Sequence, residues 1–162
     1  MRSFRDLVLG LALAVQVVAA SGAPQAVEAF TADTWPALQA GLKAPLAVVF
    51  TTTDCGHCPA AIEHLASVLH RRRGGARLAA VVMDAAPGAD DAPLLATPHY
   101  RVTDRLFAFD GQAAALRYRV NPAWRGVTPY VALLAPGRPA RLVTGEPSTD
   151  ELRAWLDAAA AR

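Results

Sequence analysis

Two apolar runs separated by an amphipathic stretch constrain the fold of this chain most strongly. Pro45–Phe50 (PLAVVF) and Arg77–Asp84 (RLAAVVMD) are almost continuously apolar and of strand length, which is typical of strands buried on both faces. Between them, apolar side chains recur at helical spacing from Cys58 onward: Ile62, Leu65, Ala66 and Leu69. A strand, a helix and a second strand form a βαβ unit with parallel strands, so the sequence predicts an α/β domain.

The C-terminal part of the chain predicts an antiparallel hairpin followed by a helix. Tyr130–Ala135 and Ala140–Gly145 are strand-like and are joined by the turn sequence PGRP. Ser148 and Glu151 have the spacing of a capping box. The buried stripe of the predicted closing helix consists of Leu152, Trp155, Leu156 and Ala159.

The remaining segments give weaker patterns. We expect a short linker from Pro24 to Ala29 and a helix capped by Asp33 or Thr34 that runs through Leu42. Residues 85–112 begin like a loop and then alternate in places like a short strand. A further helix is predicted from Asp110 or Gly111 to Tyr118.

The N-terminus has the three-part layout of a secretory signal peptide. Arg2 and Arg5 precede an uncharged apolar run from Leu7 to Ala20, and small residues follow. We expect a signal peptide over residues 1–22, with cleavage between positions 20 and 23, and one domain over residues 24–162. The apolar run is shorter than the roughly 20 residues of a spanning helix, so an uncleaved membrane anchor is the weaker alternative. The expected location is the periplasm.

Size and charge narrow the class of protein. With 162 residues, of which 53% are hydrophobic, the chain suffices for one domain with a sizeable core, and we expect a monomer. The formal charge is +2, and it falls to +1 without Arg2, Arg5 and Asp6. A nearly neutral domain gives no reason to expect nucleic acid as a partner.

The two cysteines of the chain, Cys55 and Cys58, stand at the predicted junction between strand and helix. A structural staple is excluded on magnitude, because closing so short a loop removes little entropy from the unfolded chain. A metal site is the main rival to a redox couple. Structural zinc needs four protein ligands, and only histidines such as His64, His70 and His99 could complete such a site, whereas two thiolates would also suit Cu(I).

The position of the pair favours redox chemistry. The unpaired amides of a helix N-terminus would stabilise a thiolate on Cys55, and Cys58, one turn further in, could then attack a mixed disulfide. Three neighbours would tune the pair: Gly56 by allowing a tight turn, His57 by placing positive charge beside the thiolate, and Asp54 by opposing it.

Together, the strand–CGHC–helix unit and the downstream sequence GVTPYVALLAPGRPARLVTGEPSTDELRAWL resemble the thioredoxin-like superfamily over roughly Phe30 to Ala159. The exported TlpA/ResA-like thiol-disulfide oxidoreductases are the most similar subgroup. The resemblance implies a central mixed β-sheet flanked by helices, with an insertion within Ala86–Asp110, between the second strand of the βαβ unit and the proline strand. It further implies a cis peptide bond at Pro129, with Thr128 before it, where a substrate segment would bind.

The implied activity is reduction, or isomerisation, of disulfides in protein partners by Cys55 and Cys58, with no cofactor and with a membrane electron donor restoring the dithiol. Alternatives are a copper-handling protein, as thiol reductant or Cu(I) carrier, and a disulfide oxidase. A non-catalytic binding module would be expected to lack a cysteine or the proline, and all three are present.

Four further positions bear on the site. Val49 stands where thioredoxin has a buried aspartate and protein disulfide isomerase a glutamate, and Asp54 stands where a tryptophan is usual. Trp124 and Tyr130 flank the predicted cis proline, where they could line a peptide groove or belong to the core.

Overall fold

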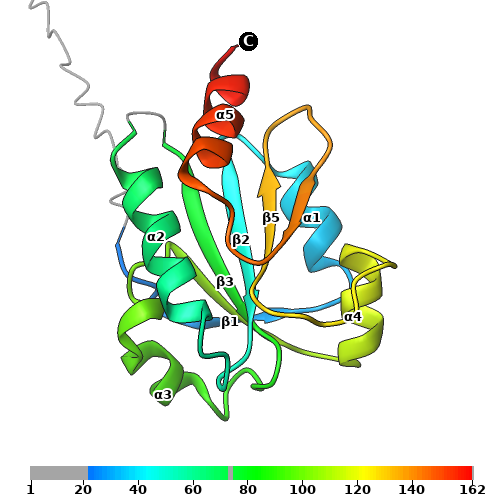
Figure 1. Cartoon of the computed structure of the whole chain (residues 1–162). Helices are drawn as coiled ribbons and strands as arrows, with labels where there is room; N and C mark the ends of the chain where they lie inside the picture. Colours follow the sequence, from blue (N-terminus) through cyan, green and yellow to red (C-terminus); the bar gives the residue numbers. More distant parts are fainter. Residues whose placement is uncertain (1–21, 73–74, 162) are drawn as a thin grey trace, which may run out of the picture.

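The computed structural model describes residues 22–72 and 75–161, which form one mixed β-sheet covered by helices on both faces (Figure 1). The sheet has six strands in the order β1-β4-β3-β2-β5-β6. The strands are β1 Val27–Phe30, β2 Leu46–Thr51, β3 Arg77–Val82, β4 Arg105–Phe109, β5 Tyr130–Leu134 and β6 Arg141–Thr144. The helices are α1 Thr34–Ala40, α2 Cys58–His70, α3 Asp91–Ala96, α4 Ala113–Val120 and α5 Thr149–Ala160, with a short 3-10 turn at Pro98–Tyr100.

Strand direction divides the sheet into two parts. Strands β1, β4, β3 and β2 run parallel to their neighbours, as the connections through helices require. Strand β5 is antiparallel to β2, with Phe50 opposite Tyr130, and β6 is antiparallel to β5. The predicted βαβ unit, the C-terminal hairpin and the mixed sheet are therefore confirmed.

Alternation along the central strands builds two hydrophobic layers. In β2, Ala47 and Val49 belong to the core that α2, α3 and α5 cover. Val48 and Phe50 belong to the opposite core, which α1 and α4 cover. Every residue of β2 is buried, as the continuous apolar run predicted.

The predicted linker at residues 24–29 is wrong in its second half, where β1 begins at Val27. Val27 and Phe30 of this strand are buried, and β1 pairs in parallel with β4, whose Leu106 lies opposite Val27. The sequence pattern missed the strand because its partner is almost 80 residues away and only four residues take part. Distant pairing of this kind leaves no local signal.

The segment 85–112 contains α3, the 3-10 turn and β4, and so holds most of the predicted insertion. The strand-like alternation near its end is confirmed, because β4 lies in the sheet between β3 and β1. Without β4, strands β1 and β3 would be separated by an empty strand position.

Helix ends differ from the predicted ones by a few residues. Helix α1 ends at Ala40, where Gly41 donates its N–H to Ala37, and Asp33 makes no side-chain capping bond. Helix α4 begins only at Ala113. The capping box of α5 is confirmed, since Ser148 accepts from the Glu151 N–H and Glu151 accepts from the Ser148 N–H.

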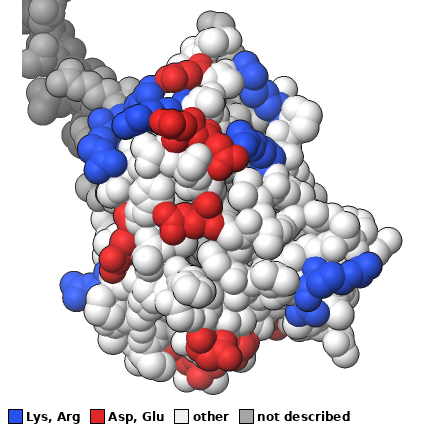
Figure 2. Space-filling model, viewed as in Figure 1, with Lys and Arg blue, Asp and Glu red and all other residues white. Residues whose placement is uncertain are grey.

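The surface charges are partly interleaved (Figure 2). Arg105 bonds Glu28 across the β1–β4 pair, Arg72 pairs with Asp157 between α2 and α5, and Arg141 pairs with Glu151. Such exposed pairs contribute little to stability.

The predicted signal peptide lies almost entirely outside the described residues. None of the helices in residues 22–72 and 75–161 has the length and apolar character needed to cross a membrane.

Candidate redox site at the end of the second strand

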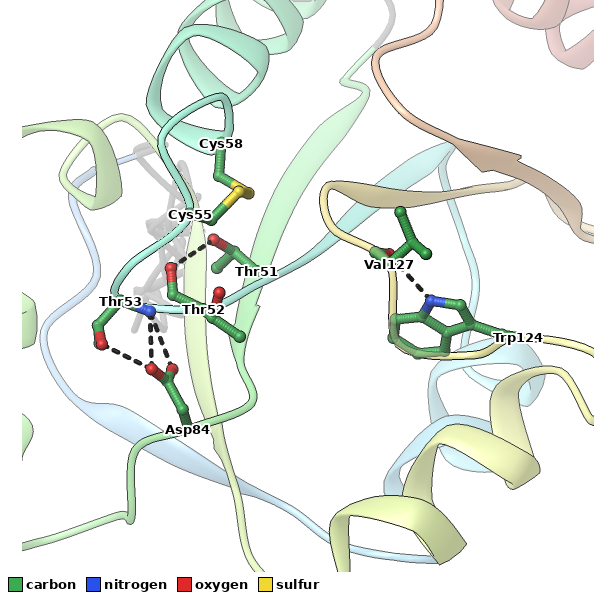
Figure 3. The surroundings of a disulfide bond; sticks show 8 residues. All are labelled: Thr51, Thr52, Thr53, Cys55, Cys58, Asp84, Trp124 and Val127. Carbon is green, nitrogen blue, oxygen red and sulfur yellow. Dashed lines mark hydrogen bonds between the residues drawn. A yellow bond between two sulfur atoms is a disulfide. The ribbon is translucent and has the colours of Figure 1, made fainter.

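The two cysteines lie where β2 ends and α2 begins, and they are joined by a disulfide bond with a Cα–Cα distance of 5.5 Å (Figure 3). The intervening chain forms a tight turn, in which the N–H of Cys55 donates to Thr52 O at 3.2 Å and that of Cys58 donates to Cys55 O at 3.3 Å. Cys58 is only 1% exposed, whereas Cys55 is half-buried. An incoming sulfur could therefore reach Cys55 and not Cys58.

The three predicted tuning residues all lie on the exposed rim of this turn. Asp54, Gly56 and His57 are exposed, and His57 is the N-cap residue of α2 without a capping bond from its side chain. The turn at Gly56 is tight, as expected, but the backbone at this position does not require a glycine. Its φ lies outside the left-handed region, and a Cβ atom there would meet nothing within 4 Å.

The peptide bond between Thr128 and Pro129 is cis, as expected. Pro129 directly precedes β5, and the Phe50–Tyr130 register places it level with the end of β2, beside the segment that leads to Cys55. Pro129 is buried, and its carbonyl accepts the Gly145 N–H at 2.8 Å, which fixes it to the end of β6.

Asp84 supports the cysteine segment from the neighbouring strand, a role that sequence reasoning missed. It follows β3, and its carboxylate accepts the Thr53 N–H at 2.9 Å and the Thr53 hydroxyl at 2.6 Å (Figure 3). A signal for this contact existed, because the carboxyl ends of adjacent parallel strands meet at one edge of the sheet. An acid after β3 therefore lies beside the loop that follows β2.

Val49 stands at the position where thioredoxin has a buried aspartate, and this position is apolar and inaccessible to solvent. Val49 is fully buried in the core beneath α2. The buried polar residue nearby in sequence is Thr51, whose side chain points toward the disulfide in Figure 3.

Burial raises the pKa of Tyr100, a hydrogen bond to the Thr51 side chain opposes this rise, and the negative charge of Asp84 adds to it.

Trp124 and Tyr130 are core residues, although a small part of Trp124 also lines a surface cleft with Arg117 and Arg125. They are 7% and 3% exposed, and their rings stack with centroids 4.3 Å apart. Trp124 also donates its Nε1–H to Val127 O at 3.0 Å, and so holds the loop before Thr128. Val127 itself is 57% exposed and lies across from the disulfide in Figure 3.

A cleft of about 360 Å³ opens on the other side of the cysteine segment. Thr53, Asp84, Asp90, His99 and Tyr100 are among its lining residues, so the insertion forms much of its wall. Burial lowers the pKa of His99 below its usual 6.5, and the negative charge of Glu63 partly opposes this.

The histidines considered as metal ligands are scattered. His64 contacts Glu146 through Nδ1, and its Nε2 lies 2.9 Å from the Thr149 hydroxyl. His70 is exposed on α2, and His99 lines the cleft. Within residues 22–72 and 75–161, no three His, Cys, Asp or Glu side chains are grouped as a metal site would require.

The chain matches no protein-family profile and no curated protein sequence. Its structure is similar to that of a secreted disulfide oxidoreductase of Mycobacterium tuberculosis homologous to E. coli DsbE, with a TM-score of 0.51 and 20% identity over 74% of this chain and 85% of that one. The structure of MTB DsbF has a TM-score of 0.51 and 15% sequence identity to this chain, and the match covers 75% of this chain and 84% of DsbF. A thioredoxin-related protein from Neisseria meningitidis serogroup B has a TM-score of 0.55 and 17% sequence identity, and the match covers 76% of this chain and 90% of that protein.

Identities this low show a similarity of fold alone. The chain thus has a thioredoxin-like fold, with a Cys-x-x-Cys pair where the second strand meets its helix.

Proposed function

We propose that the protein is an exported thiol-disulfide oxidoreductase that reduces disulfides of protein partners through Cys55 and Cys58. The observation that carries the proposal is the unequal exposure of two bonded cysteines at a helix start. A half-buried Cys55 can meet a partner, and a buried Cys58 can meet only Cys55. A nucleophile and a protected resolving thiol need this difference.

The reaction starts from the dithiol form. The Cys55 thiolate, stabilised by the positive end of α2, attacks one sulfur of the partner disulfide, so that a mixed disulfide forms and one partner thiolate leaves. Cys58 loses its proton and attacks the Cys55 sulfur, which forms the Cys55–Cys58 disulfide and releases the second partner thiolate. The partner gains two electrons. One of its thiolates is protonated by the proton from Cys58 and the other by a proton from water, which replaces the proton that Cys55 lost when its thiolate formed.

The dithiol must then be restored by a second dithiol. For an exported protein we assign this role to a membrane electron donor, as the resemblance to TlpA/ResA-like reductases implies. The signal-like segment over residues 1–22 supports export to the periplasm, and the β4 insertion supports the subgroup. Isomerisation uses the same first step and differs in the fate of the mixed disulfide.

Peptide binding is assigned to Thr128 and Pro129. Support comes from the register, which sets the start of β5 level with the end of β2, and from Val127, whose exposed side chain borders the same edge. Backbone groups of Thr128 would pair with an extended segment of the partner.

A trapping experiment tests the proposal. Cys58→Ser should accumulate mixed disulfides between Cys55 and its partners, seen as bands on a non-reducing gel that dithiothreitol abolishes. The matched control is Cys55→Ser, which should trap far less because Cys58 is buried. Equal trapping by both variants, or by neither, would overturn the assignment of Cys55 as the nucleophile.

A further inference from the structure

Three arginines that have no acidic partner among the described residues are gathered on α4 and the following loop. Arg117 and Arg119 lie on α4, and Arg125 lies in the loop that leads to β5. No ion pair or side-chain hydrogen bond joins any of the three to another described residue, whereas Arg72, Arg105, Arg141 and Arg153 all have acidic partners. Figure 2 shows blue residues over α4 bordered by white, while blue and red mix near α5.

The same segment carries the two large apolar side chains that stand most exposed among the described residues. Tyr118 is 64% exposed and Val127 is 57% exposed. Aromatic side chains and arginines are the residue types enriched in protein interfaces. Apolar exposure and unpaired positive charge therefore coincide on one short stretch of a nearly neutral chain.

A cleft of about 300 Å³ gives this surface a definite shape. It is lined by Ala114, Arg117, Tyr118, Pro122, Trp124 and Arg125. The Arg117 side chain lies across Gly126, where an added Cβ would come within 3.3 Å of Nε, and φ of this glycine is +87°. The absence of a side chain at Gly126 thus leaves room for the Arg117 side chain beside the backbone.

The cleft is tied to the edge that faces the disulfide. Its floor includes Trp124, whose Nε1–H donates to Val127 O and whose ring lies 5.1 Å from that of Phe50, near the end of β2. A protein segment bound beside Arg117 and Arg125 would therefore continue toward Val127, Thr128 and the cysteine pair.

We propose that this cleft binds an acidic segment of the disulfide-bearing partner, next to the sulfur atoms that react. The inference rests on the proposed function and adds partner selection to it. Guanidinium groups bind carboxylates through paired N–H donors, and here two of them flank a cleft with an aromatic rim. Tyr118 would cover apolar atoms of the bound segment.

An anionic membrane is the other acidic surface to consider, and the geometry disfavours it. Lipid surfaces attract clusters of about four to eight cations on a flat or convex face. Here only two arginines, Arg117 and Arg125, line the site, and the site is concave.

The test compares two synthetic peptides that carry the same internal disulfide, one flanked by aspartates and one by asparagines. The second-order rate constant for oxidation of the reduced protein by each peptide is measured at low and at high salt. We expect the acidic peptide to react about 10-fold faster at low salt, the lower end of the range for electrostatic steering. High salt should reduce the ratio.

Charge reversal identifies the residues. Arg117→Glu/Arg125→Glu should lower the acidic-to-neutral rate ratio to about one or below, and Arg117→Gln/Arg125→Gln should lower it by a smaller factor. The matched control is Arg101→Glu/Arg138→Glu, which changes the same charge at two exposed arginines elsewhere and should keep the wild-type ratio.

The outcomes separate the two proposals. If neither peptide oxidises the dithiol, the proposed function fails. The docking proposal alone fails if the acidic and the neutral peptide oxidise the wild-type dithiol at equal rates. It also fails if the Arg101→Glu/Arg138→Glu control lowers the acidic-to-neutral rate ratio as much as the Arg117→Glu/Arg125→Glu variant does. It fails as well if Arg117 and Arg125 instead govern co-sedimentation with phosphatidylserine vesicles while the peptide ratio stays unchanged.

Discussion

The Asp84 carboxylate clamps Thr53 two residues before Cys55, through bonds to the Thr53 N–H at 2.9 and 3.0 Å and to the Thr53 hydroxyl at 2.6 Å. This contact joins the ends of β2 and β3 at the edge of the sheet where the redox pair lies. The turn that carries Cys55 is thus held by the residue that follows the neighbouring strand β3.

A double-mutant cycle on this pair tests the clamp. Thr53→Ala, Asp84→Ala and the double variant should give a coupling energy of about 1 kcal/mol in urea unfolding, because hydrogen bonds to a carboxylate are stronger than neutral ones and this one is exposed. The Asp84 variant should also exchange disulfides more slowly. A coupling energy near zero would contradict a clamp, and Thr53→Ser, which keeps the hydroxyl, should behave as the wild type.

The site residues that could be predicted from the sequence are those whose motifs lie within a short stretch of the chain. Cys55, Cys58 and Pro129 follow from short motifs in a strand, a helix and a hairpin, each recognisable within about 20 residues. Asp84 lies 31 residues from Thr53, and Val27 of β1 lies 79 residues from its partner Leu106 in β4. Such contacts depend on strand order, which periodicity does not encode.

Trp124 provides the second prediction. Trp124→Phe keeps an aromatic ring against Tyr130 and removes the Nε1–H donor to Val127 O. We expect a loss of about 1 kcal/mol in unfolding free energy, together with slower exchange with protein disulfides than with a small disulfide, because the loop before Thr128 loosens.

The comparison of substrates separates local loosening from general destabilisation. The control is Leu116→Val, which changes a buried residue of α4 and leaves the hydrogen bond from Trp124 to Val127 O intact. If it lowers the protein-to-small-disulfide rate ratio as much as Trp124→Phe does, the bond to Val127 has no specific role.

His99 provides a pH-dependent prediction. Its pKa in the folded protein lies below 6.5, mainly through burial, so between the two pKa values the unfolded chain binds more protons. His99 therefore reduces stability as the pH falls through about 6.5 toward the folded-state pKa. His99→Gln should lessen the loss of unfolding free energy on going from about pH 8 to about pH 5.

The control for this measurement is His70→Gln on the exposed face of α2, which should leave the pH profile as in the wild type. A His99→Gln profile that parallels the wild type throughout would show that the cleft does not disfavour the imidazolium.

Other differences from the sequence prediction have a packing origin. Trp124 and Tyr130 could be groove or core on pattern alone, and the stacked rings against Phe50 decide for the core. Gly56 was expected to allow a tight turn, and the turn is present, yet φ of this residue lies outside the left-handed region and an added Cβ would meet nothing within 4 Å. The turn is set instead by the hydrogen bonds from Cys55 and Cys58 to the carbonyls before them.

The central claim is that Cys55 and Cys58 form a reversible redox pair in the folded protein. It is tested most directly by equilibrating the protein in thiol–disulfide buffers and measuring the dithiol fraction by alkylation, with the fold followed by circular dichroism. We predict one two-electron transition with a midpoint between about −270 and −120 mV, the lower end favouring a reductase, and no loss of structure. A pair that stays oxidised below about −300 mV, or whose reduction unfolds the domain, would identify a structural disulfide and contradict this account.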